Sequence, residues 1–389
     1  MMTFSQMPYE RPNRQEMLDR LSAFCDQFQA ASSAEEQLTI IRELETESDR
    51  IQTLSSICYV RNTIDTRDTF YEAEREFWDE VEPLLSEKMQ DFNRLMVASA
   101  FRPQLEKELG SLYFTNAELS LKAFSPEIIP LMQEENALRA SYQKLYASAR
   151  VEFDGKICNI AQLGPYKQSP DREVRRAAIF AEGQFFDEHQ AEFDDIFDRL
   201  VKNRTAQAKA LGFDSFVELG YIRQMRNCYD AAAVANFRRQ VVEELVPITM
   251  EIKKNQARRI GVEDFKFYDN SFCFPDGNAT PKGTPEELLA HARRMYTEMS
   301  PETAEFIDLM FQMELFDLVA KDGKAPGGYC TSFPDYRCPF IFSNFNGTSA
   351  DVDVLTHEAG HAFADYVAAR SIPVSGLRSP TMEGCETHS

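Results

Sequence analysis

Two histidines and a glutamate near the end of the chain have the types and spacing of a metal site. They form the run His357-Glu358-Ala359-Gly360-His361. Residues four apart in a helix lie one turn apart, so both imidazoles would leave one face and could bind one zinc ion. Glu358 would lie about 100° further around the helix. That position suits a general base that takes a proton from a water molecule activated by the metal.

A histidine pair with this spacing can also be two ordinary surface or core residues, because short motifs match by chance. The metal interpretation is favoured because the chain has five histidines, and three of them lie in residues 357–389. The two small residues inside the motif would let another element approach closely. Val352, Leu355 and Phe363 would supply a buried face for the same helix.

A zinc site with three protein ligands and one water needs a third donor. The candidates after the histidine pair are Asp365, Glu383, Glu386 and His388. Asp365 lies one turn past His361, so it is better placed to accept a hydrogen bond from an imidazole N–H. The other candidates follow a second helix start at Ser379. Spacing alone does not choose between Glu383 and Glu386, which would lie one turn apart on one face.

The elements that would position these residues can be predicted from their flanks. Thr348-Ser349 offers an N-cap for a helix that carries the histidines and ends near Pro373. The stretch before it, residues 321–347, is rich in Gly, Pro and Asn and contains a β-prone run, which predicts a small sheet.

The β-prone run enters the histidine helix directly, so it is a candidate for binding an extended peptide along a free sheet edge. The candidate substrate-binding residues are Phe340, Ile341, Phe342, Ser343 and Asn344. The alternative is that Phe340 and Phe342 only pack the core.

The rest of the chain predicts mostly helices. Ser33 and Glu36 have capping-box spacing, and Thr69–Met96 is amphipathic with Pro83 expected to kink or split it. Asp154-Gly155 predicts a tight hairpin. Further helix signals are starts at Ser169-Pro170, Thr284-Pro285 and Ser300-Pro301 and a stop at Gly212.

Composition excludes several classes of partner. The 42 basic and 63 acidic residues give a net charge of −21, which argues against nucleic acid and anionic membranes. No apolar run approaches the roughly 20 residues of a membrane span, and the N-terminus lacks the apolar core of a secretion signal. The eight cysteines show no CxxC pairs. Reduced thiols in the cytoplasm are therefore expected.

Four segments of the second half resemble one peptidase family. They are GGYC (327–330), PFIFSNFNGT (339–348), HEAGH (357–361) and SPTMEGCETHS (379–389). Together they resemble the oligoendopeptidase F branch of the thimet oligopeptidase family of zinc metallopeptidases. The stretch ALGFDSFVELGYIRQMRNCYD (210–230) and the N-terminal helical hairpins fit the same family, so the resemblance covers most of the chain.

The resemblance implies a mainly α, multi-helical zincin-type peptidase with a small β segment beside the HExxH helix. It assigns the third zinc ligand to Glu386 and leaves Glu383 on the helix face or beside the ligands. Residues 1–190 would form an N-terminal helical domain, and residues 191–389 the first part of the catalytic domain. A deep channel between helical halves would admit short peptides, which implies an oligopeptidase with Glu358 as general base.

Chains of this family continue well beyond the third ligand, and the later part contributes a Tyr and a His that resemble transition-state stabilisers. This sequence stops at Ser389. We therefore expect an incomplete catalytic domain and a peptidase that is inactive or weakly active in this form. Two other functions remain open at this point: a non-catalytic helical scaffold that binds peptides, and a zinc exopeptidase.

Overall fold

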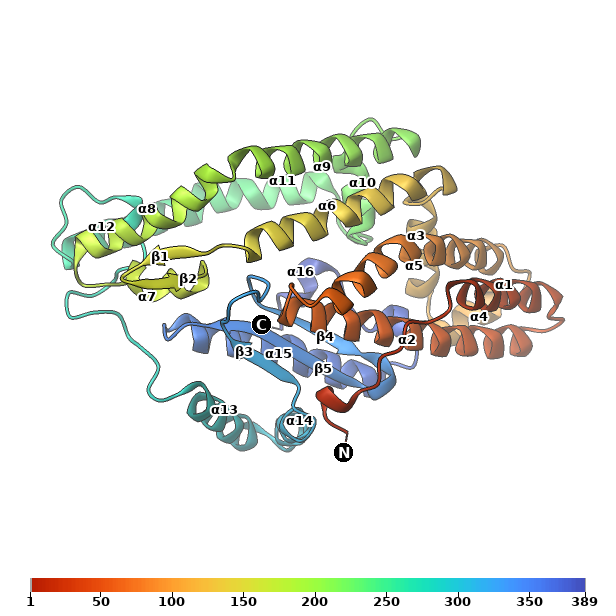
Figure 1. The fold of residues 1–389 in the computed structure, drawn as a ribbon. Coiled ribbons are helices and arrows are strands. Elements are labelled where there is room, and N and C mark those ends of the chain that lie inside the picture. Colours follow the sequence, from red (N-terminus) through yellow and green to blue (C-terminus); the bar gives the residue numbers. More distant parts are fainter. Residues whose placement is uncertain (1, 389) are drawn as a thin grey trace.

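The computed structural model describes residues 2–388, which form a mainly helical molecule with two small sheets (Figure 1). Long helices from the first half of the chain lie above and beside the sheet that precedes the histidine helix. Within the described residues, no helix combines the length and apolar character needed to cross a membrane. The predicted mainly α fold, with a small β segment beside the histidine helix, is confirmed.

The N-terminal helices pack around Trp78, which is fully buried. Ser33 caps its helix by accepting a hydrogen bond from the Glu36 N–H at 3.2 Å, but the Glu36 carboxylate bonds to Ser32, so only half of the predicted capping box forms. Of the kink or split predicted at Pro83, the split does not occur, because α3 continues through this residue, and the kink stays a prediction. The helices are α1 (Arg14–Ala30), α2 (Ala34–Ile64), α3 (Thr69–Val97), α4 (Arg102–Leu109), α5 (Ser111–Lys122) and α6 (Ile129–Ala147).

The middle of the chain begins with the predicted hairpin, β1 (Val151–Phe153) and β2 (Lys156–Cys158). Asp154 and Gly155 have φ values of 52° and 70°, the left-handed conformations that a two-residue type I′ turn requires. The following helices are α7 (Gly164–Lys167), α8 (Arg172–Glu188), α9 (Gln190–Ala210) and α10 (Phe216–Arg223).

Two predicted helix boundaries in this region have different outcomes. Asp171 caps α8 by accepting a hydrogen bond from the Glu173 N–H, so the predicted start at Ser169 is two residues early. Gly212, with φ 83°, follows the end of α9 as predicted. Residue 190 is the first of α9, and the division of the chain into domains 1–190 and 191–389 stays a prediction.

A long helix follows, made of α11 (Ala231–Gln240), a π-helical turn (Val241–Leu245) and α12 (Val246–Arg259). The wider turn lies just before Pro247, whose missing N–H and bulky ring disturb a regular α-helix. No residue from 231 to 255 is buried. The end of α12 is fixed by Gln256, whose side-chain amide donates to the carbonyls of Asn270 and Phe272 at 3.0 and 2.8 Å.

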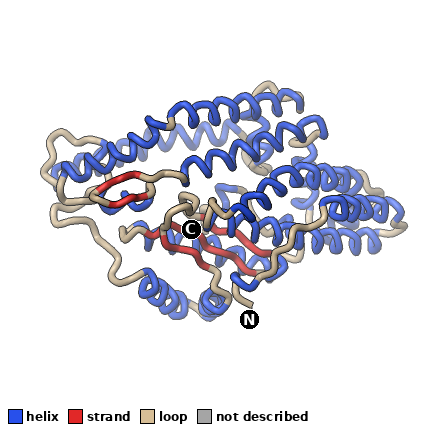
Figure 2. The backbone as a smooth tube through the Cα atoms, in the orientation of Figure 1, coloured by secondary structure: helices blue, strands red, loops and turns tan. Residues whose placement is uncertain are grey.

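The second sheet has the strand order β3-β5-β4, with β5 in the centre (Figure 2). Its strands are β3 (Phe316–Val319), β4 (Tyr329–Phe333) and β5 (Cys338–Phe345), and the helices before it are α13 (Pro285–Met299) and α14 (Pro301–Gln312). Thr284 and Ser300 cap these two helices as predicted. β5 pairs in parallel with β3 and antiparallel with β4.

The predicted substrate-binding edge is wrong, because β5 is paired on both sides. Phe340, Ile341 and Phe342 are fully buried, and Ser343 is 3% exposed. Asn344 is half-buried and directs its amide to the loop before β4 rather than to a free edge. The alternative, in which Phe340 and Phe342 pack the core, is the one that the structure supports.

The predicted histidine helix is α15 (Ala350–Ser371), which packs against β5. Its first turn is held by Asp351, whose carboxylate accepts hydrogen bonds from the N–H groups of Asn346 and Gly347 at 2.9 and 2.8 Å. The helix expected from Ser379 is shorter than predicted. Only α16 (Met382–Cys385) forms, capped by Thr381.

Candidate metal centre

His357 and His361 lie one turn apart on α15, and their rings meet edge to face with centroids 4.8 Å apart. Their Nε2 atoms are 3.2 Å apart. Two nitrogens bound to one tetrahedral zinc at about 2.0–2.1 Å would be about 3.3 Å apart. The imidazoles therefore already have the spacing that a shared zinc ion requires.

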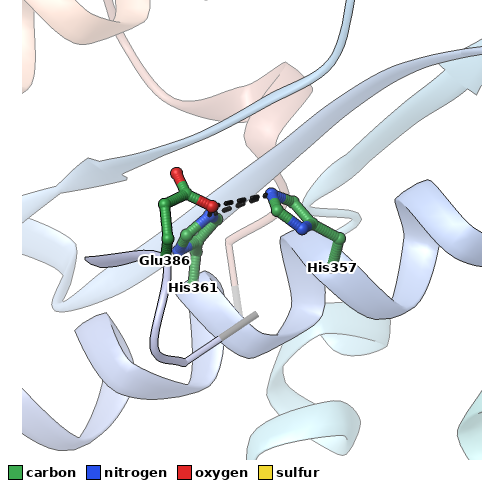
Figure 3. Close-up of side chains that lie close together, drawn as sticks. All are labelled: His357, His361 and Glu386. Carbon is green, nitrogen blue, oxygen red and sulfur yellow. Dashed lines mark hydrogen bonds and ion pairs between the residues drawn. The ribbon is translucent and has the colours of Figure 1, made fainter. Parts of the chain in front are cut away.

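Glu386 brings a carboxylate to the same point (Figure 3). Its Oε2 lies 3.5 Å from Nε2 of His357 and 3.8 Å from Nε2 of His361. The donor atoms of the three residues all lie within 4.8 Å of one another. Two imidazoles and a carboxylate that converge from separate segments are a donor set suited to zinc. The residues therefore fit the ion chemically, and their role as ligands stays a prediction.

Glu358 lies on the buried side of α15 and is 6% exposed. Burial raises the pKa of its carboxyl group, positive charge on His357 lowers it, and the Glu386 carboxylate raises it. A carboxylate whose pKa is raised toward neutrality accepts protons more readily. Glu358 has Gly328, in the loop before β4, as a neighbour. A β-carbon added to Gly328 would lie 3.4 Å from Oε1 of Glu358.

Glu383 is directed away from the imidazoles. Its carboxylate accepts hydrogen bonds from Arg226 and from the Tyr229 hydroxyl group. These bonds from Tyr229 and Arg226 lower the pKa of Glu383 to about 2. The two glutamates that spacing left equivalent are thus separated: Glu386 faces the histidines and Glu383 faces the α10–α11 connection.

Asp365 does not have the role that we predicted for it. Its carboxyl group interacts with the Ser332 side chain, and Oδ2 is buried without a hydrogen-bond partner among residues 2–388. No hydrogen bond joins it to either imidazole in that part of the chain. Burial raises the pKa of Asp365 to about 6. His388 lies outside the converging donor set.

The loop between β3 and β4 is a part of the site to which the sequence analysis gave no role. Gly327 has φ 85°, and its carbonyl and that of Ala325 accept hydrogen bonds from the Asn344 amide at 2.8 and 2.9 Å. These contacts fix the loop next to Gly328, which lies beside Glu358. The Gly-Gly pair was visible in the sequence, but the residue it faces lies 30 positions later, so no local pattern connected them.

The segment that leads to Glu386 is attached to α2, which was also not predicted. The carboxylate of Glu45 accepts hydrogen bonds from the N–H groups of Ser375 and Gly376 at 2.8 and 3.3 Å. Arg378 donates to Asp49 at 3.0 Å. Both acceptors lie more than 300 residues earlier in the chain, so helix periodicity gives no signal for these pairs.

Comparisons with known proteins agree with this architecture. The family model described as peptidase M3 N-terminal domain matches residues 4–124, and the one described as peptidase family M3 matches residues 165–289 and 299–389. An oligoendopeptidase F homolog from Lactococcus lactis subsp. lactis (strain IL1403) is 22% identical, over 85% of this chain and 57% of the relative. The chain thus spans less than two thirds of that relative's length.

Solved structures give a stronger match. The structure of PZ peptidase A with inhibitor 2 is 48% identical, with a TM-score of 0.98, over 100% of this chain and 69% of that one. A structure from Bacillus anthracis str. Ames that is described under the name oligoendopeptidase F is 44% identical, again with a TM-score of 0.98, over 100% of this chain and 71% of that one. Together with the family models, these matches show that the chain belongs to peptidase family M3, in its oligoendopeptidase F branch.

Proposed function

We propose that this chain carries the zinc-binding part of a metalloendopeptidase that hydrolyses peptide bonds in short oligopeptides. The single observation that carries the proposal is the convergence of His357 Nε2, His361 Nε2 and Glu386 Oε2 within 4.8 Å. The names of its relatives, oligoendopeptidase F and PZ peptidase A, support a peptide substrate. The name oligoendopeptidase F also supports endopeptidase action over exopeptidase action.

The mechanism assigns separate tasks to the residues of the site. His357, His361 and Glu386 would hold one zinc ion, which supplies Lewis acidity toward water and the scissile carbonyl. Glu358 takes the proton of the attacking water and delivers it to the leaving amine. The Gly328 loop lies beside the Glu358 carboxylate and would limit its movement.

We place the protein in the cytoplasm, where its substrates would be free peptides. The eight cysteines are all free in the structure, as reduced thiols would be. The net charge of −21 gives no support for nucleic acid as a partner.

Zinc binding and peptide cleavage test the proposal in two steps. The metal-free chain is titrated with zinc beside the His357→Ala variant, and we expect one zinc per wild-type chain and none in the variant. The zinc-loaded chain is then given a fluorogenic peptide blocked at both ends, and the products are identified by mass. Internal cleavage that is lost in the Glu358→Gln variant supports an endopeptidase. A folded wild-type chain without affinity for zinc would overturn the proposal.

A further inference from the structure

The segment that carries Glu386 has little structure of its own. Residues 372–388 (the Glu386 segment) contain one 3₁₀ turn, Ser375–Leu377, and the single helical turn of α16, Met382–Cys385. A helix of four residues is not stable in water by itself. The position of the Glu386 carboxylate must therefore be set by contacts with other elements.

The first half of this segment is fixed on α2 by the Glu45 and Asp49 bonds described above. The second half, from Arg378 to Glu386, is held by a different element of the fold. Within residues 2–388, the side-chain hydrogen bonds that reach positions 379–385 from another element come from Arg226 and Tyr229. They end chiefly on Glu383, one turn before Glu386.

Arg226, Tyr229 and Glu383 form what we call the Glu383 cluster. Arg226 Nε donates to Glu383 Oε1 at 2.9 Å, and its Nη2 contacts the same oxygen, while the Tyr229 hydroxyl donates to Oε2. Each carboxylate oxygen thus has its own donor. Hydrogen bonds between charged groups are stronger than neutral ones, and an arginine paired with a carboxylate fixes geometry as well as distance.

The Arg226 side chain is also restrained by contacts other than those with Glu383. Its guanidinium carbon lies 4.3 Å from the centre of the Tyr221 ring and 5.8 Å from that of Tyr229. The Arg226 side chain is 15% exposed, whereas that of Glu383 is 44% exposed. A partly buried, stacked arginine loses less side-chain freedom on pairing than a freely moving one. This distinguishes the Arg226–Glu383 pair from ordinary surface ion pairs, which contribute little to stability.

The cluster joins two distant parts of the chain. Arg226 and Tyr229 lie in the connection between α10 and α11, which is tied to α5 by a 2.8 Å hydrogen bond from the Asn227 amide to Asn116. Glu383 lies 157 residues beyond Arg226. The connection therefore contacts the Glu386 segment directly.

We propose that Arg226 and Tyr229 are positioning residues for the metal site. By holding Glu383, they fix α16 and place the Glu386 carboxylate beside the two imidazoles. The affinity for zinc then depends on the α10–α11 connection, although none of its residues binds the metal. This inference rests on the proposed function, because it requires His357, His361 and Glu386 to be the ligands.

The test is a mutant cycle read out as the zinc dissociation constant, measured by competition with a chromophoric chelator. We expect Arg226→Gln, Tyr229→Phe and Glu383→Gln each to weaken zinc binding by about tenfold, at the lower end of the effect of removing an outer partner of a metal ligand. If Arg226 acts through Glu383, the double variant Arg226→Gln/Glu383→Gln will bind zinc no more weakly than Glu383→Gln alone.

Two further measurements separate positioning from general destabilisation. Bound Co²⁺ in the Arg226→Gln variant should show a visible spectrum shifted toward that of Glu386→Gln, while the thermal unfolding of the metal-free chain changes little. The matched control is Arg293→Gln, which removes an exposed ion pair between α13 and α14 with a 2.7 Å contact to Asp308. It should leave both zinc affinity and the cobalt spectrum unchanged.

The outcomes distinguish this inference from the proposed function. A wild-type chain that binds no zinc overturns the proposed function itself. A wild-type chain whose zinc depends on His357, together with unchanged affinity in the Arg226 and Glu383 variants, overturns only the positioning role. Additive losses in the double variant would also overturn it, because the two residues would then act independently.

Discussion

A β-carbon added to Gly328 would lie 3.4 Å from Oε1 of Glu358 and 3.1 Å from Cγ1 of Val354. The backbone of the loop before β4 thus leaves room for no more than a hydrogen at Gly328, beside the carboxylate that we assign as general base. The 3.1 Å contact with Val354 is closer than carbon atoms normally approach, so a larger residue would push Val354 or the loop aside, and the loop would shift relative to Glu358.

The first prediction concerns this contact. Gly328→Ala should lower kcat by about tenfold, because displacement of a catalytic group by a fraction of an ångström is costly. Zinc affinity should not change, since the three proposed ligands are untouched. Gly183→Ala in α8 is the control, because its added β-carbon would meet nothing within 4 Å. Equal kcat in wild type and Gly328→Ala would show that the loop does not position Glu358.

The second prediction separates the base from the ligand. Glu358→Gln should keep zinc bound and lower turnover by roughly 10²–10⁴-fold, because an amide cannot take the proton from water. Glu386→Gln should instead weaken zinc by more than the roughly 10–100-fold typical of outer partners. Metal content after dialysis and the rate on a blocked peptide measure the two effects. Loss of zinc in Glu358→Gln comparable to that in Glu386→Gln would contradict these roles.

The third prediction concerns stability and pH at Asp269, which is fully buried. Burial alone would raise its pKa, but hydrogen bonds from Arg172, the Lys266 N–H and Arg175 lower it to about 2. Asp269→Asn should cost about 3 kcal/mol of unfolding free energy at pH 7, because it leaves Arg175 without its buried partner.

The sign of the pH dependence follows from the lowered pKa. The stabilisation by Asp269 is complete above the ordinary aspartate pKa of about 4 and is lost as the pH falls toward 2. Urea unfolding of wild type and Asp269→Asn at pH 6 and pH 3 should therefore show a difference that shrinks at the lower pH. Asp264→Asn is a control, since that side chain is 75% exposed. A difference that stays constant with pH would contradict the assignment.

The fourth prediction concerns Lys324, which lies in the loop before β4 and has a fully buried side chain. Its ammonium group donates to Asp317 and to the carbonyls of Val319 and Ser343. Lys324→Met should lower the free energy of unfolding by about 3 kcal/mol, because the buried acceptors lose their donor. Chemical denaturation at pH 7 measures this, with Lys321→Met, an exposed neighbour, as the control.

Burial also lowers the pKa of Lys324 from 10.5 to about 8, although Asp317 opposes the shift. The unfolded chain then holds this proton up to a higher pH than the folded chain. Wild type should consequently gain stability relative to Lys324→Met as the pH rises from 8 to 10.5. The same difference at both pH values would show that this lysine keeps its ordinary pKa.

Local patterns predicted the elements that depend on neighbouring residues. The histidine helix, the Asp154-Gly155 hairpin and the caps at Thr284 and Ser300 each follow from a few adjacent side chains. The β-prone run of β5 was also visible. Its place at the centre of the sheet was not, because that depends on pairing with β3 and β4, which a strand's own sequence does not encode.

Orientation and long-range pairing limited the prediction of the site. Asp365 lies four residues after His361, but each such step turns about 40° further around a helix, and its carboxyl group meets Ser332 instead of an imidazole. Helix spacing could not separate Glu383 from Glu386, because Glu383 is turned away by its pairing with Arg226, which lies 157 residues earlier in the chain. Contacts of this kind leave no periodic signal in a single sequence.

The long helix from Ala231 to Arg259 should open far more easily than its length suggests. None of its residues before Gln256 is buried, and it passes through a π-helical turn at Val241–Leu245. Tertiary packing, rather than intrinsic propensity, supplies most of the stability of a protein helix. We expect its backbone amides to exchange with deuterium fastest near the π-helical turn and slowest beside Gln256, whose side chain anchors the C-terminal end. One continuous helix would then contain a gradient of local unfolding free energy, from near zero in its middle to that of the surrounding core at its end.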